Sequence, residues 1–136
     1  MKRLSICWII GCLLGLVACR PEVPAQAEQG ETDVFPDYRE VTVPVNIAPP
    51  NFKLVDQQLQ GITRLKTMNR ELIIAADQGV FNLPETDWKV LSQDAQGKQI
   101  DVTVYFREPQ SNWKQMSFPI YVSRDSVDAY LVYRRI

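Results

Sequence analysis

Apolar and polar residues alternate along several short stretches of the chain, which is typical of strands that bury one face. Residues 41–47 and 99–106 carry apolar side chains at every second position. In the second stretch we expect the even-numbered residues, from Ile100 to Phe106, to face the core, with Tyr105 on the opposite side. Pro44 has no N–H to donate to a ladder, so the first stretch is predicted to lie at the edge of a sheet.

Further strands are predicted where short apolar runs are separated by turn-forming residues. The run Leu72–Ala76 is the most continuously apolar, which favours a central strand. The sequence "EPQSN" at 108–112 predicts the connection of a hairpin. The remaining strands are expected at residues 51–55, 59–66, 71–76, 113–116, 118–122 and 127–133.

One segment has the spacing of a helix and predicts two to three turns over residues 84–94. Pro84 suits a first helical turn, and the acidic residues that follow it favour the positive end of the helix dipole. Trp88 and Leu91 are three residues apart and therefore share one face. Gly97 is a suitable C-terminal stop.

About seven short strands and one helix within roughly 100 residues predict an all-β fold, specifically an Ig-like β-sandwich over residues 34–136. The cysteine and tryptophan pattern of antibody domains is absent from the sequence. The printed chain ends at Ile136 within a predicted strand, so the domain is expected to be the N-terminal part of a longer protein.

The first residues have the organisation of an export signal, with Lys2 and Arg3 before an apolar run from Ile6 to Val17. This run is too short to span a bilayer, which needs about 20 apolar residues. The sequence Leu-Val-Ala-Cys at 16–19 resembles a bacterial lipobox, which implies that residues 1–18 are removed and that Cys19 carries fatty acyl chains. A plain cleaved signal and an uncleaved membrane helix are the alternatives.

Residues 19–33 are rich in Pro, Glu, Gln and Ala and poor in large apolar side chains. Such a segment buries too little surface to offset the entropy lost on ordering. We therefore predict a flexible tether between the lipid and the folded domain.

Composition narrows the possible functions. The chain contains no histidine and three cysteines, of which only Cys19 would remain after removal of the signal. A Cys/His zinc site and a Ser-His-Asp triad are therefore excluded, and we expect neither an enzyme nor a cofactor. Removal of the signal takes two of the 15 basic residues, Lys2 and Arg3, and none of the 16 acidic residues. The mature chain is therefore weakly acidic. We expect no nucleic-acid partner, because phosphate binding needs clustered basic residues.

Two groups of residues are candidate binding sites. Tyr105 and Trp113 flank the 108–112 connection and predict a surface for stacking sugar rings. The alternative is that the aromatic residues fill the core and its rim.

The second group belongs to "NIAPPNF", in which Asn46 and Asn51 flank Pro49 and Pro50. Paired prolines favour a stiff, extended backbone that could dock a partner. The alternative is a rigid crossover between the two sheets.

The segments "FPDYREVTVPVNIAPPNFKLV" and "FPIYVSRDSVDAYLVYRRI" resemble a poorly characterised group of Bacteroidota-type lipoproteins. In longer members this β domain is followed by TolB-like propeller repeats, and some members carry a cytochrome c biogenesis label. This chain lacks the propeller. The resemblance implies an envelope protein that is lipid-anchored to a membrane and faces the periplasm or the cell exterior. We expect a non-catalytic interaction or assembly module for envelope proteins, with carbohydrate binding as the alternative.

Overall fold

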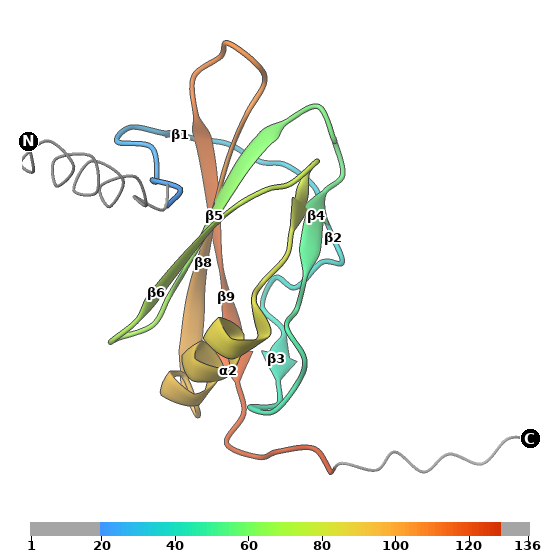
Figure 1. Cartoon of the computed structure of the whole chain (residues 1–136), viewed down its shortest axis with the longest axis vertical. Coiled ribbons are helices and arrows are strands. Elements are labelled where there is room, and N and C mark those ends of the chain that lie inside the picture. The colour runs from blue at the N-terminus through green and yellow to red at the C-terminus, as the bar shows by residue number, and fades with distance from the viewer. Residues whose placement is uncertain (1–19, 129–136) are drawn as a thin grey trace, which may run out of the picture.

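The computed structural model describes residues 20–128, which form nine short strands in two sheets and one short helix (Figure 1). This mostly β architecture with one helix confirms the coarse fold class expected from the sequence. Within residues 20–128, no helix has the length and apolar composition needed to cross a bilayer.

The larger sheet contains six strands, and its long members are built from the alternating stretches of the sequence. β8 pairs antiparallel with both β5 and β9, whereas the two-residue strands β1 and β3 pair parallel with the far side of β9. The order along the sheet is β1 (Glu28–Gln29), β9 (Lys114–Val122), β8 (Gln99–Arg107), β5 (Gln60–Lys66) and β6 (Glu71–Ala75), with β3 (Thr42–Val43) also beside β9.

The smaller sheet contains three very short strands, β2 (Val34–Phe35), β4 (Phe52–Leu54) and β7 (Val80–Phe81). β4 lies in the middle and pairs antiparallel with both neighbours. The register Val34↔Leu54 places these two buried side chains on one face. Phe35 and Lys53 are also paired and lie on the opposite face, away from the core.

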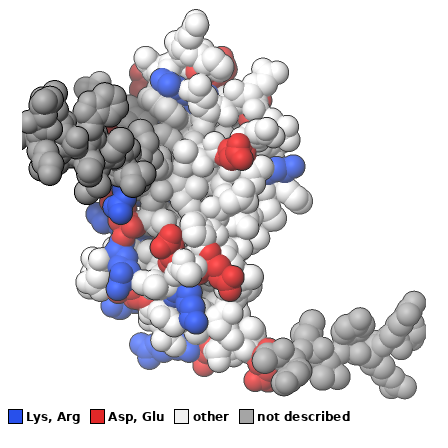
Figure 2. Space-filling model, in the orientation of Figure 1, with Lys and Arg blue, Asp and Glu red and all other residues white. Residues whose placement is uncertain are grey.

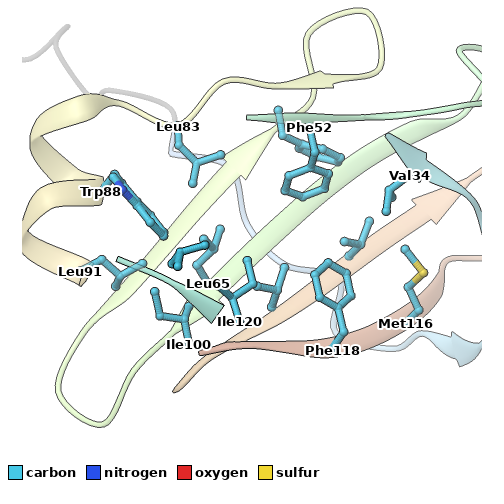
Figure 3. Close-up of a cluster of buried hydrophobic side chains, with 14 of the residues drawn as sticks. Val34, Phe52, Leu65, Leu83, Trp88, Leu91, Ile100, Met116, Phe118 and Ile120 are labelled. Atoms are coloured by element: carbon cyan, nitrogen blue, oxygen red, sulfur yellow. The ribbon is translucent and has the colours of Figure 1, made fainter. Parts of the chain in front are cut away.

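The two sheets and helix α2 (Glu85–Asp94) enclose a single hydrophobic core (Figure 3). The helix contributes Trp88 and Leu91, and the smaller sheet contributes Phe52. Facing them are apolar side chains of the larger sheet, including Ile100 and Ile120, which pair directly across β8 and β9. The helix predicted at 84–94 is therefore confirmed, with its apolar face in the position that its spacing required.

Pro119 lies within β9 without interrupting it. Odd-numbered residues of β9 direct their backbone groups away from β8, as the bond from the Tyr121 N–H to the Val41 carbonyl shows. Pro119 lies between the stretches of β9 that pair with β1 and β3. The missing N–H therefore removes no ladder bond, and the Pro119 carbonyl still accepts from the Glu40 N–H at 3.0 Å.

The strand predicted over residues 41–47 is much shorter in the structure, where only β3 is extended. After Pro44 the chain turns, with the Ile47 N–H donating to the Pro44 carbonyl. The carbonyls of Val45 and Ile47 then accept side-chain hydrogen bonds from α2. The alternating residues predicted a longer strand with backbone pairing, but residues 45 and 47 form hydrogen bonds with the helix instead.

The run Leu72–Ala76 was predicted to be a central strand, but β6 lies at the edge of the larger sheet. Its apolar residues Leu72, Ile73 and Ile74 are all half-buried. Arg20, Pro21, Pro84 and Asp87 line a cleft together with residues of this edge strand. An edge strand that is partly covered can thus be as apolar as a central one.

Part of the segment predicted to be a free tether, residues 19–33, belongs to the sheet. The Glu28 N–H donates to the Trp113 carbonyl at 2.9 Å, and the Gly30 N–H donates to the Gln115 carbonyl at 3.0 Å. Pairing with β9 supplies order that composition did not reveal. At the other end, Val127 and Asp128 form no strand, and residues 129–133 of the last predicted strand lie outside the described residues.

Candidate functional site

Trp113 lies at the end of the larger sheet, one residue before β9 and beside the β8–β9 hairpin connection. The Arg107 guanidinium lies over its ring, 4.4 Å from the ring centroid. Arg107 is held in turn by its Nε, which donates to Gln60 Oε1 at 2.8 Å. The ring is therefore fixed in place, with a cation covering one of its faces.

Tyr105 shares this face of the sheet with Trp113, because it pairs with Gln115, two residues further along β9. Only 5% of Tyr105 is exposed, however, so its ring offers no open surface for a ligand. The two aromatic residues thus share a face of the sheet, but Tyr105 does not line the cleft beside Trp113.

A cleft of about 310 Å³ opens beside Trp113. Its walls carry polar groups from Gln26, Glu28 and Asn112, together with Arg107. One aromatic ring surrounded by amide, carboxylate and guanidinium groups could bind a sugar or another small polar ligand, because the ring stacks while the polar groups bond hydroxyls. Gln26 and Glu28 come from the segment predicted to be a tether.

The side chains of the "NIAPPNF" segment serve the fold. The Asn46 amide donates to the Val127 carbonyl at 2.8 Å and accepts from the Val127 N–H at 2.9 Å. The Asn51 side chain accepts from the Leu83 N–H at 2.8 Å. Pro50 is buried and Pro49 is half-buried. Both asparagines predicted to dock a partner therefore have intramolecular partners.

Helix α2 fastens this same segment to the core. Trp88 Nε1 donates to the Ile47 carbonyl at 3.0 Å, and Ser92 Oγ donates to the Val45 carbonyl at 3.0 Å. A groove of about 360 Å³ remains between the segment and the helix, lined in part by Ile47, Pro49 and Glu85. These contacts support the alternative of a rigid crossover.

A second groove follows the free edge of β6, and the sequence did not predict it. One cleft of about 440 Å³ is lined by Arg20, Ile73 and Pro84, among others. A second cleft, of about 410 Å³, reaches Arg70. Both clefts include Glu71, Leu72 and Asp87, so they form one continuous groove between β6 and α2.

The turn that joins β5 to β6 closes one end of this groove. The Thr67 N–H donates to the Arg70 carbonyl at 2.9 Å, and the Arg70 N–H donates to Thr67 Oγ1 at 3.0 Å. Asp94 of α2 accepts from the Thr67 hydroxyl and, at 2.9 Å, from the Asn69 amide. These bonds lower the pKa of Asp94, with the Thr67 hydroxyl making the largest contribution.

Met68 projects from this turn and is 79% exposed. Its neighbours in the turn are held by hydrogen bonds, so the thioether side chain is presented by a rigid backbone. The signal in the sequence was an apolar residue within "KTMNR", a stretch that could be identified only as a turn.

Residues 20–128 contain no cluster of three or more His, Cys, Asp or Glu side chains that could hold a metal ion. Cys19, the predicted lipidation site, lies outside the described residues. No family model, curated protein or solved structure matches the chain. The resemblance to the lipoprotein group therefore stays a prediction.

Proposed function

We propose that the protein is a lipid-anchored component of the cell envelope whose domain binds or helps to assemble other envelope proteins without catalysing a reaction. In this proposal Cys19 carries the lipid and the two sheets form an Ig-like β-sandwich that faces the periplasm or the cell exterior. The lipobox-like sequence at 16–19 supports the anchor. A surface of the smaller sheet supports the interaction role.

That surface, the outer patch, consists of Phe35, Lys53, Val55 and Val80 on the face of the smaller sheet that points away from the core. Phe35 is 61% exposed and Val55 is 56% exposed. Phe35 pairs with Lys53, and Val55 follows Lys53 by two residues, just past the end of β4. Neighbouring apolar side chains that face water mark interaction surfaces more often than isolated ones do. The outer patch is the observation that carries the proposal.

The proposal is tested by placing a photo-crosslinking amino acid at Val55 and, as a matched control, at Val90, which is 40% exposed on α2. Irradiation of whole cells should give one discrete crosslinked protein from position 55. The double variant Phe35→Asp, Lys53→Glu should lose that product while its circular dichroism spectrum stays unchanged. Equal products from positions 55 and 90, or a product that survives the double variant, would count against the outer patch.

Carbohydrate binding is the second candidate, favoured by the cleft beside Trp113. Retardation on a polysaccharide affinity gel should disappear in Trp113→Ala if the ring stacks on a sugar. Tyr121→Ala is the control, because Tyr121 is exposed at the other end of β9. No retardation of the unaltered protein on gels covering the common cell-wall and capsule sugars would remove this candidate.

A further inference from the structure

The first described residue lies against the domain and not at a distance from it. Arg20 and Pro21 line the groove beside β6, and Val23, Pro24 and Ala27 are all half-buried. Residues 28–30 then bond to β9. If Cys19 is lipidated as proposed above, the acyl chains therefore begin one residue from the β6 edge, with no free spacer between the lipid and the fold.

The β5–β6 hairpin, whose edge strand lines the groove together with Arg20, ends in a turn that carries basic and exposed apolar side chains. Lys66 and Arg70 flank Met68 on the β5–β6 turn, and all three are exposed. Figure 2 shows charged side chains gathered over the end of the molecule that carries α2 and the tip of β6, with blue ones along its margin. The smaller sheet, with the outer patch, lies on the other side of the molecule (Figure 1).

Lys66, Met68 and Arg70 match the chemistry of a bilayer surface. Basic side chains near a membrane are attracted by anionic lipid. A methionine held between them can enter the interfacial region, while the long basic side chains keep their charges at the phosphates. Four acidic residues oppose this attraction: Glu71 and Asp101 pair with Lys66 across the neighbouring strands, Asp94 lies near Arg70, and Asp87 lines the same groove. Arg64 offsets part of this negative charge, with its Nε 3.8 Å from Glu71 Oε1.

We propose that the tip of the β5–β6 hairpin contacts the bilayer that holds the Cys19 lipid, with Met68 in the interface and Lys66 and Arg70 against lipid phosphates. This inference rests on the proposed lipid anchor. It fixes the orientation of the domain, because contact through this end directs the outer patch away from the membrane and towards envelope partners.

The experiment uses the full mature protein, purified from cell membranes and reconstituted in vesicles that contain anionic phosphatidylglycerol. Lipidation of Cys19 leaves no free thiol in the mature chain, so Met68→Cys provides a single site for an environment-sensitive fluorophore. Val55→Cys on the smaller sheet is the matched control. We expect a blue-shifted emission and quenching by nitroxide-labelled lipids at position 68, with neither effect at position 55.

The other outcomes are distinguishable. If mass spectrometry finds the lipid on Cys19 but position 68 behaves like position 55, the membrane contact is refuted while the anchor stands. If Cys19 is unmodified, at least one thiol besides position 68 is labelled and both proposals fail. A blue shift without quenching by the nitroxide-labelled lipids, which disappears when the protein is diluted among the vesicles, would indicate contact with a second copy of the chain and would overturn the membrane contact.

The role of the cations is tested in the Met68→Cys background by Lys66→Glu together with Arg70→Glu. Both side chains are exposed, but Lys66 pairs with Glu71 and Asp101 across the strands, so a circular dichroism spectrum first verifies that the variant keeps the fold. Quenching at position 68 should fall strongly in anionic vesicles. Unchanged quenching would refute phosphate recognition by these two residues.

Discussion

Asp94 links two elements through hydrogen bonds that require an ionised carboxylate, since it accepts from Thr67 and Asn69 at the β5–β6 turn. Its folded-state pKa lies below the unfolded value of 3.8. The charged form therefore stabilises the fold above that pH, and the contribution is lost as the pH falls through the folded-state pKa. We therefore predict that protonation of Asp94 contributes to the loss of stability at acid pH.

We expect Asp94→Asn to flatten the decline of the melting temperature below about pH 4, because an amide does not titrate. Some decline should remain, since Arg39 also lowers the pKa of Asp37. Asp87→Asn, an exposed change on the same helix, should leave the decline intact. Scanning calorimetry from pH 2 to 7 measures all three proteins. Superimposable curves for Asp94→Asn and the unaltered protein would contradict the assignment.

Gly97 is the residue at which backbone conformation restricts the side chain most. Its φ is +72°, and an added Cβ would lie 2.6 Å from Arg124 Nε. We expect Gly97→Ala to lower the free energy of unfolding by about 1–2 kcal/mol, which is the cost of a left-handed conformation in a residue with a Cβ. Gly97→Asn should cost less, because asparagine tolerates this conformation better. Urea denaturation compares the two, and equal losses would argue for a purely steric cause.

At the scale of elements, helix α2 is held by hydrogen bonds to a segment that forms no strand. Trp88 is 1% exposed, and its indole N–H bonds to the Ile47 carbonyl. In Trp88→Phe the carbonyl loses this donor, and we expect a loss of about 1–3 kcal/mol from the unsatisfied group. Val90→Ala, at an exposed position of the same helix, should change stability by much less. Chemical denaturation of both variants tests this, and similar losses would show that the hydrogen bond is unimportant.

Elements with long periodic stretches could be predicted from the sequence, and short ones could not. β5 and β9 bury alternate residues over seven and nine positions, which is enough to fix both type and face. β8 also has an alternating sequence, but in the structure it is buried on both faces from Val102 to Phe106. β2 and β7 have two residues each, too few to show any period. Their existence depends on β4, which lies between them and pairs with both.

At the scale of the whole molecule, the chain from Arg20 to Gly30 joins the domain to its N-terminal end through parallel pairing with β9. We predict that the Glu28 and Gly30 amides are protected in hydrogen exchange, because both donate to β9 carbonyls. The Glu22 and Gln26 amides provide the comparison. NMR-detected exchange at neutral pH measures all four amides. Free exchange at Glu28 and Gly30 would restore the tether predicted from composition.

The candidate sites also divide into those that the sequence could indicate and those that only folding brings together. Sequence spacing put Tyr105 and Trp113 on one face of a hairpin, but it could not show that only Trp113 lines a cleft. It missed the groove along β6, because Arg20, Arg70 and Asp87 are far apart in the chain and meet only through folding.

The sequence alone determined the mostly β class, the helix at 85–94 and the faces of the long strands, because each follows from a local period that any compact fold must bury. The tertiary structure alone decided that Leu72–Ala76 forms an edge, that Tyr105 is covered, and that residues 28–30 belong to the sheet. These features depend on which segments become neighbours. Pairing between distant backbones is set by the packing of the whole core, and no local pattern of side chains encodes it.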